Sequence, residues 1–186
     1  MGAALIVIDV QNEYFAGPYA IVYPERHGSL ARIVAAMRAA AGAGVPVVVV
    51  RHGEVAPDAA EFRPGSHGHA LHADVDAEHR DHLVDKTYPG TFTGTDLESW
   101  LRANDIASLV ITGYMTHMCC DTTTRQAVHL DMSVTVLSDA TGTIDLTDAT
   151  GAAVSAEVVH RTELAVLGNG FAAVMDTDAW IASLTS

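Results

Sequence analysis

Three residues of different chemistry each follow a predicted β-strand in this chain: an acid at Asp9, an amine at Lys86 and a thiol at Cys119. The carboxyl ends of parallel strands meet at one edge of a sheet, so such strands would bring the three side chains together. A carboxylate can take the proton of a thiol, and an ammonium group favours the resulting thiolate. The three positions therefore predict a cysteine nucleophile with a base of its own.

Lys86 is the only lysine of the chain, and arginine occupies the nine other basic positions. An ammonium is compact and titratable whereas a guanidinium is a wide fork, so a lone lysine at a strand end favours a catalytic role. The ordinary alternatives are an exposed loop lysine, a capping role for Asp9 and cysteines that only pack in the core. The coincidence of all three residue types at strand ends favours catalysis.

The two cysteines are neighbours, at positions 119 and 120, in a segment typical of strand, turn and helix. Neighbours on a helix point about 100° apart, so we expect Cys119 at the site and Cys120 in the core. In the first turn of a helix the dipole favours the thiolate of Cys119. Adjacent cysteines are poorly placed to form a disulfide with each other, which favours a reducing, cytoplasmic location.

Composition limits the class of protein. The chain has 186 residues, of which 49% are apolar and 18% charged, and this predicts one globular domain over residues 1–186. The formal net charge of -13 opposes binding to nucleic acid or to an anionic membrane. Neither a signal peptide nor a run long enough to cross a membrane is expected.

Short β-branched runs alternate with helical patterns along the chain. This alternation predicts an α/β fold with three layers (α/β/α) and a doubly wound, mainly parallel sheet of six strands, which is Rossmann-like. Two long segments without a pattern, 11–23 and 51–80, are expected to be loops. The predicted strands are 3–10, 45–50, 82–84, 109–112, 133–137 and 171–175, and the predicted helices are 24–42, 93–102, a segment ending near 130, 148–164 and 178–184.

Three motifs resemble those of the isochorismatase-like cysteine hydrolases, in particular their nicotinamidase-related amidohydrolases. Asp9-Val-Gln-Asn-Glu-Tyr-Phe is similar to the family's Asp-x-Gln-Asn-Asp-Phe, which bears the catalytic acid. Gly113-Tyr-Met-Thr-His-Met-Cys119-Cys-Asp-Thr-Thr resembles the nucleophile motif Gly-x-x-Thr-x-x-Cys-Val-x-x-Thr. Lys86, with the segment from Tyr88 to Leu97, resembles the family's lysine motif. The motifs occur in the family's order and span most of the chain.

The resemblance implies a catalytic triad of Asp9, Lys86 and Cys119 and a cis peptide between Tyr114 and Met115. The backbone N–H groups of Met115 and Cys119 would then form an oxyanion hole for a tetrahedral intermediate. The resemblance also implies a homo-oligomer, either a dimer or a tetramer.

Several aromatic and histidine side chains lie close in sequence to the proposed catalytic positions. They could form a slot for a small planar or cyclic amide. The alternative is that they only pack against neighbouring side chains, and for Phe92 this alternative is nearly as well supported. His52 is included because it directly follows a strand. The candidate substrate-binding residues are Tyr14, Phe15, His52, Tyr88, Phe92 and His117.

The loop 51–80 is rich in histidine, and His52, His67 and His69 could bind zinc or iron. The nicotinamidase branch has an Asp-x-His metal motif after its second strand, whereas this chain has Arg51-His-Gly-Glu54. Without that aspartate, a polar lid or a pocket lining is the favoured interpretation of these histidines. We therefore expect no metal and no other cofactor.

These observations predict a metal-independent amidohydrolase that cleaves a carbon–nitrogen bond of a small molecule through a thioester on Cys119. Two other classes remain open. A vinyl-ether hydrolase like isochorismatase would need Asp9 and Lys86 but no thiol nucleophile, and a non-catalytic binding relative would usually lack one member of the triad. The sequence does not distinguish nicotinamide, ureido compounds, maleamate-like acids and lactams as the substrate.

Overall fold

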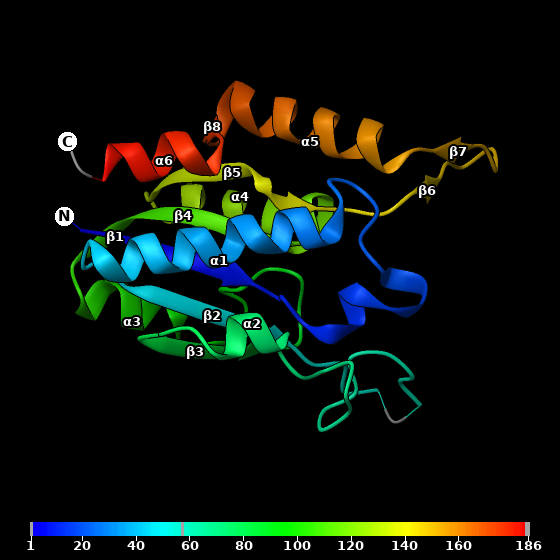
Figure 1. Cartoon of the computed structure of the whole chain (residues 1–186), viewed down its shortest axis with the longest axis horizontal. Coiled ribbons are helices and arrows are strands. Elements are labelled where there is room, and N and C mark those ends of the chain that lie inside the picture. Colours follow the sequence, from blue (N-terminus) through cyan, green and yellow to red (C-terminus); the bar gives the residue numbers. More distant parts are fainter. Residues whose placement is uncertain (1, 57, 185–186) are drawn as a thin grey trace.

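In a computed structural model that describes residues 2–56 and 58–184, six strands form one parallel sheet in the order β3-β2-β1-β4-β5-β8 (Figure 1). This is the strand order of the dinucleotide-binding doubly wound folds. The predicted six-stranded α/β architecture is confirmed, and every pairing in the main sheet is parallel. The strands are β1 (Gly2–Ile8), β2 (Val47–His52), β3 (His82–Lys86), β4 (Ile106–Tyr114), β5 (Ser133–Gly142) and β8 (Ala173–Met175).

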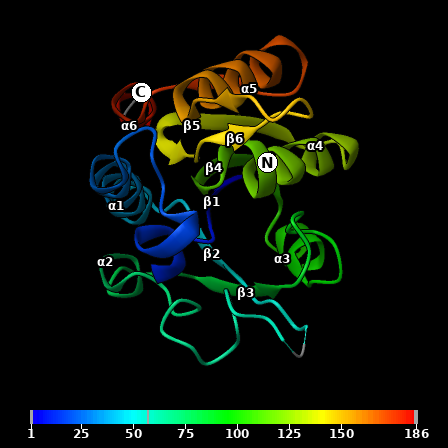
Figure 2. The same ribbon diagram turned by 90° about the vertical axis from the view of Figure 1, so that its right-hand side faces the viewer.

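Helices cover both faces of the sheet (Figure 2). One layer holds α1 (Arg26–Gly42), α2 (Ala73–Asp76) and α6 (Thr177–Ser183), and the other holds α3 (Leu97–Ala103), α4 (Asp121–His129) and α5 (Ala156–Gly170). Three short helical segments lie over the ends of strands: η1 (Asn12–Phe15), η2 (Gly17–Tyr19) and η3 (Thr116–Cys120), the last being a π-helical turn.

The central strand β1 is apolar along its whole length because both of its faces are buried. Leu5 and Val7 pack toward α1 and α6, while Ile6 and Ile8 pack toward α3, α4 and α5. All four side chains are completely buried. The uninterrupted apolar run in the sequence therefore corresponds to a strand between two helix layers.

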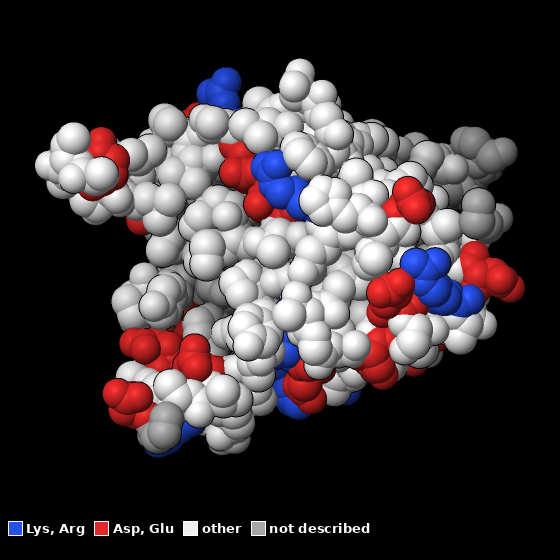
Figure 3. Space-filling model, turned by 180° about the vertical axis from the view of Figure 1, so that it is seen from behind, with Lys and Arg blue, Asp and Glu red and all other residues white. Residues whose placement is uncertain are grey.

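The carboxyl ends of the strands point toward the right side of Figure 1, between the loop of residues 53–72 and an arm formed by β6 (Leu146–Thr147) and β7 (Ala153–Val154). The space-filling view from behind shows a notch in the outline between these two projections (Figure 3). The sheet order reverses between β1 and β4, and in such sheets the crevice at this reversal is where ligands bind.

Charged side chains of both signs lie close to one another on the face drawn in Figure 3. Among the residues described on that face, Lys and Arg form no extended patch. In the described part of the chain, no helix is long and apolar enough to cross a membrane.

The segment 148–164 differs from the prediction of a helix beginning at Asp148. Asp148 instead accepts hydrogen bonds from Thr150 and Ala152 and closes the antiparallel β6–β7 turn, while Ser155 caps α5 through the N–H of Val158. Asp competes for backbone N–H groups in this way, and so favours a turn over a helix interior. The loop predicted over 51–80 also differs, because β2 extends to residue 52 and α2 forms within the loop.

Candidate active site

Asp9 directly follows β1 and adopts a left-handed backbone conformation with φ of 53°. Such a conformation is uncommon for aspartate and persists where surrounding contacts hold it. The Asp9 N–H donates to the carbonyl of Val50 at 3.0 Å, and its carbonyl accepts from the N–H of Gln11 at 2.8 Å. These bonds turn the chain sharply at the strand end and aim a fully buried carboxylate into the sheet edge.

Cys119 lies in the π-helical turn that follows β4. The carbonyl of Met115 accepts from the N–H groups of Met118 at 3.1 Å and Cys120 at 3.2 Å, so the first turn is wider than in an α-helix. Cys119 is 6% exposed and reaches the site, whereas Cys120 is completely buried among apolar side chains. The structure thus separates the two thiols as the sequence predicted.

Gly113 explains how the nucleophile turn comes so close to Asp9. It has φ of 108°, and a Cβ at this position would lie 2.0 Å from the carbonyl oxygen of Ile8. No other residue type permits β4 to approach β1 this closely. The next peptide, between Tyr114 and Met115, is cis in the structure, as the resemblance implied.

Lys86, the last residue of β3, connects the two other groups. Its Nζ lies 2.7 Å from Oδ2 of Asp9 and 3.3 Å from Sγ of Cys119, and its side chain has no exposed surface. No described N–H or O–H group makes a hydrogen bond to Oδ1 of Asp9. The carboxylate therefore has a free oxygen for the thiol proton, and the predicted triad residues do converge.

Burial affects the ionisation of the Cys119 thiol. Loss of solvation and then the charge of Asp9, opposed by Lys86, raise the pKa of the Cys119 thiol to about 12. Burial therefore opposes the thiolate that the helix terminus was expected to favour. Ionisation requires transfer of the proton to a base, and the Asp9 carboxylate is the buried base that shares the Lys86 ammonium with the thiol.

Gln11 is a residue whose role the sequence interpretation missed, although it belongs to the first motif. Its side-chain amide donates to the carbonyls of His52 and His69, both at 2.8 Å, and its Oε1 accepts from the N–H of His52 at 2.9 Å. The side chain is completely buried. It fixes the end of β2 and the loop 53–72 to the turn that carries Asp9.

Tyr14 is a candidate substrate-binding residue that lies beside the triad. It is 3% exposed, and burial, followed by the charges of Cys119 and Asp9, raises the pKa of its hydroxyl well above the usual value. Its ring packs against Phe62 of the loop 53–72, with centroids 5.1 Å apart. Phe62 also meets the ring of His52 edge-on at 5.4 Å and thereby closes the site from the loop side.

The other candidate binding residues occupy different surroundings. Phe15 packs against His72, with ring centroids 4.3 Å apart, and His117 hydrogen bonds to Thr143. Tyr88 is 58% exposed. Phe92 packs against the apolar cluster that contains both cysteines, in agreement with the packing alternative. The roles of these four residues in binding substrate remain predictions.

A buried histidine outside the motifs holds the nucleophile turn in place. Nδ1 of His160, on α5, lies 2.9 Å from Oγ1 of Thr116, and its Nε2–H donates to the carbonyl of Ser138 at 3.0 Å. Burial lowers the pKa of His160 below its usual value, so the ring is a neutral link between η3 and β5. A single histidine within a helical pattern gave no signal of this role.

The histidine-rich loop does not gather its side chains. Nδ1 of His52 faces Lys86, and the carbonyl of His67 accepts from Asn12 at 3.0 Å. His69 is 9% exposed and, together with Lys86, lines a cavity of about 230 Å³. Among the described residues, no group of three or more His, Cys, Asp or Glu side chains is arranged to hold a metal ion.

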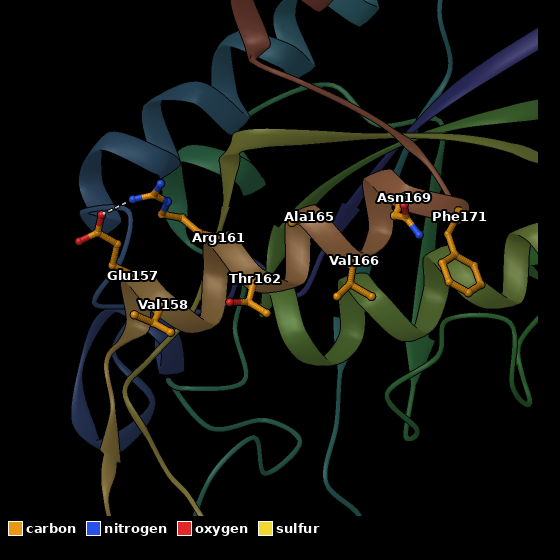
Figure 4. A pocket seen from close by; sticks show the side chains of 9 residues that line it. Glu157, Val158, Arg161, Thr162, Ala165, Val166, Asn169 and Phe171 are labelled. Atoms are coloured by element: carbon orange, nitrogen blue, oxygen red, sulfur yellow. Dashed lines mark hydrogen bonds and ion pairs between the residues drawn. The ribbon is translucent and has the colours of Figure 1, made fainter.

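A separate surface groove runs along the outer face of α5 (Figure 4). Exposed Val158 and Val166 contribute apolar surface to it, and Glu157 and Arg161 form an ion pair at 3.3 Å. The groove contains no thiol and no member of the triad. It therefore offers none of the chemistry found at the sheet edge.

One carboxyl group of α5 makes stability depend on pH. Burial and the neighbouring Asp121 raise the pKa of Glu163 to about 7, from 4.5 in the unfolded chain, and Arg125 opposes this only partly. The contribution of Glu163 to the stability of the folded state therefore falls as pH rises from 4.5 to 7. We expect Glu163→Gln to stabilise the protein by about 1 kcal/mol at pH 8, after allowance for solvent screening, and to have little effect at pH 4.5.

Thermal unfolding of both proteins at the two pH values measures this difference. For a chain of this size the expected gain in Tm at pH 8 is about 2 to 4 °C. Glu157→Gln, on the exposed side of the same helix, is the matched control and should not change the pH dependence. An equal effect of Glu163→Gln at both pH values would contradict the assignment.

Comparisons with known proteins cover most of the chain. A family model described as the isochorismatase domain matches residues 3–179. The chain is 34% identical over 185 residues to an uncharacterized isochorismatase family protein of Bacillus subtilis, covering 97% of this chain and 99% of that protein. It is 31% identical over 194 residues to ureidoacrylate amidohydrolase of Variovorax paradoxus, covering 87% of this chain and 75% of that protein.

The fold comparison gives the same result. A crystal structure of an isochorismatase-related protein from Burkholderia xenovorans LB400 superimposes with a TM-score of 0.94 at 49% identity, covering 98% of this chain and 87% of that one. The sequence match and the structural match both extend over nearly the whole chain. The chain belongs to the isochorismatase family of hydrolases.

Proposed function

We propose that this hydrolase is a cysteine amidohydrolase that cleaves a carbon–nitrogen bond of a small molecule through a thioester on Cys119. The observation that carries the proposal is the position of the Lys86 ammonium, 2.7 Å from the Asp9 carboxylate and 3.3 Å from the thiol, in a buried site. The amide substrate of the ureidoacrylate relative supports the same reaction class.

The reaction follows from the roles of these groups. Asp9 takes the proton of Cys119, and the thiolate attacks the carbonyl carbon to form a carbon–sulfur bond, with the π electrons moving to oxygen. Backbone N–H groups of Met115 and Cys119 would stabilise that oxyanion. The carbon–nitrogen bond then breaks, and the amine leaves with the proton from Asp9. Water, deprotonated by Asp9, attacks the thioester and releases the acid and the thiol.

A vinyl-ether hydrolase is the second candidate, because it too would use an acid and a lysine. It gives no reason for a thiol at 3.3 Å from the lysine that also pairs with the acid, so the amidohydrolase is favoured. A non-catalytic relative is disfavoured because all three triad groups are present and in contact. A panel of small amides, ureido compounds and lactams, assayed for released ammonia or amine, tests the proposal, and isochorismate serves as the comparison substrate.

The location and assembly of the enzyme are part of the proposal. Both cysteines are free thiols, which suits the reducing cytoplasm. We propose a homo-oligomer, dimer or tetramer, which light scattering of the purified protein would measure directly.

Activity is expected to survive chelation. A cysteine with its own base and oxyanion hole can complete acyl transfer without a Lewis acid, and the Asp-x-His metal motif is replaced here by Arg51-His-Gly-Glu54. After prolonged dialysis against EDTA, turnover should stay within about twofold of the untreated enzyme, and metal analysis should give far less than one ion per chain. Stoichiometric zinc or iron with chelator-sensitive, metal-restored turnover would overturn this prediction.

A further inference from the structure

His52 faces the catalytic lysine because of strand register. Parallel pairing of β2 with β3 places His52 directly beside Lys86, and the N–H of Gly53 donates to the Lys86 carbonyl at 2.9 Å. Register partners in adjacent strands present their side chains on the same face of the sheet. Nδ1 of the imidazole lies 3.4 Å from Nζ of Lys86.

The direction of this hydrogen bond is determined by its partners. An ammonium group only donates, so Nδ1 accepts and the ring proton of the neutral imidazole is on Nε2. Burial and then the charge of Lys86 lower the pKa of His52, which keeps the ring neutral. The other charged or titratable neighbours of the ring are Asp9 at the end of β1 and Glu54 and His69 of the loop.

An ammonium has three N–H donors, and this one has three acceptors. They are Oδ2 of Asp9 at 2.7 Å, Sγ of Cys119 at 3.3 Å and Nδ1 of His52 at 3.4 Å. Since the Lys86 side chain has no exposed surface, bulk water does not supply a replacement acceptor. Loss of the third acceptor would leave a buried donor unsatisfied and free the ammonium to turn away from the sulfur.

The imidazole is itself held firmly. The side chain of Gln11 hydrogen bonds to both the N–H and the carbonyl of His52, and the ring of Phe62 packs edge-on against it. These contacts fix the backbone and the ring plane, so the acceptor is presented at one place.

We propose that His52 is a positioning residue that completes the acceptor set of Lys86 and so orients the ammonium toward the thiol of Cys119. The role differs from the predicted one of contacting substrate. It rests on the proposed function for its catalytic consequence, but the effect on thiol reactivity does not require a substrate.

The test uses the full chain in a Cys120→Ala background, so that Cys119 is the only thiol. The rate of alkylation by iodoacetamide at pH 8 is followed by intact mass for the parent and for His52→Ala, His52→Asn and His52→Gln. Asn places its amide oxygen near the position of Nδ1, whereas Gln places it near Nε2. We expect alkylation to be at least tenfold slower in the Ala and Gln variants and within about threefold of the parent in the Asn variant.

The change in alkylation rate distinguishes a positioning role of His52 from mere filling of space. A smaller side chain that only opened the site would make alkylation faster, not slower.

With an amide substrate in hand, kcat should fall with the alkylation rate while KM changes less than about threefold. Parental alkylation in the Gln variant, or a change confined to KM, would overturn the proposal. If His52→Ala does not fold, the Asn and Gln pair still decides it. A parent that hydrolyses no amide would refute the proposed function alone.

Discussion

Cys119→Ala is expected to abolish hydrolysis, with a loss of at least about 1,000-fold in kcat, while Cys120→Ala keeps most of the activity. The thiol of Cys119 is in contact with Lys86 at 3.3 Å, and the thiol of Cys120 is completely buried in the core. Only the first is therefore placed to form the covalent bond of the proposed reaction. Steady-state assays of ammonia release by the two variants measure the difference.

Cys120→Ala is the matched control, because it removes one sulfur atom at the neighbouring position. Its expected cost is a loss of stability of about 1 to 2 kcal/mol from the small cavity, which a denaturant titration would show. An inactive Cys120 variant beside an active Cys119 variant would mean that the helical register has been assigned wrongly.

Lys86→Arg is expected to lower kcat by about 100-fold or more with the fold retained. The ammonium occupies a site with no exposed surface and contacts Asp9 and Cys119 at hydrogen-bond distance. A guanidinium is wider and planar, so it cannot keep both contacts without moving one partner, and a displacement of about 1 Å can cost 100-fold in rate. Kinetics on any amide found by screening provide the measurement.

Two measurements keep this second prediction interpretable. Circular dichroism and thermal unfolding should show a folded protein, since the positive charge beside Asp9 is preserved. Arg51→Lys makes the reverse exchange at a partly exposed position that pairs with Asp85, and should leave kcat unchanged. Parental kinetics in Lys86→Arg would remove the lysine from the triad.

Much of the fold and the centre of the site could be predicted from the sequence for a physical reason. Strands buried on both faces are apolar throughout, so β1 and β4 stand out as uninterrupted runs. In a parallel sheet their carboxyl ends share one edge, and Asp9, Lys86 and Cys119 are brought together there. The order and spacing of the motifs were sufficient because the backbone topology does the positioning.

The parts of the fold and of the site that could not be predicted depend on tertiary contacts and local hydrogen bonds. These leave no periodic pattern in the sequence. Phe62 reaches the site from an irregular loop with φ of 50°, and His160 supports the nucleophile turn from a distant helix. The helix predicted from Asp148 is replaced by a hairpin because local side-chain hydrogen bonds to the backbone compete with helix formation. The raised pKa of the Cys119 thiol follows from its burial, which residue order does not reveal.

In the proposed reaction Cys119 carries the acyl group during turnover, and this acyl-enzyme can be trapped. The Cys120→Ala protein is mixed with an active amide from the screen, quenched in acid within milliseconds to seconds and analysed by intact mass and peptide mapping. Hydroxylamine is added in parallel to intercept a thioester as a hydroxamate.

We expect a mass increase equal to the acyl group on Cys119, formed no more slowly than turnover, together with hydroxamate product. Turnover that continues with neither an acyl adduct nor a hydroxamate, and that persists in Cys119→Ala, would contradict the proposed reaction.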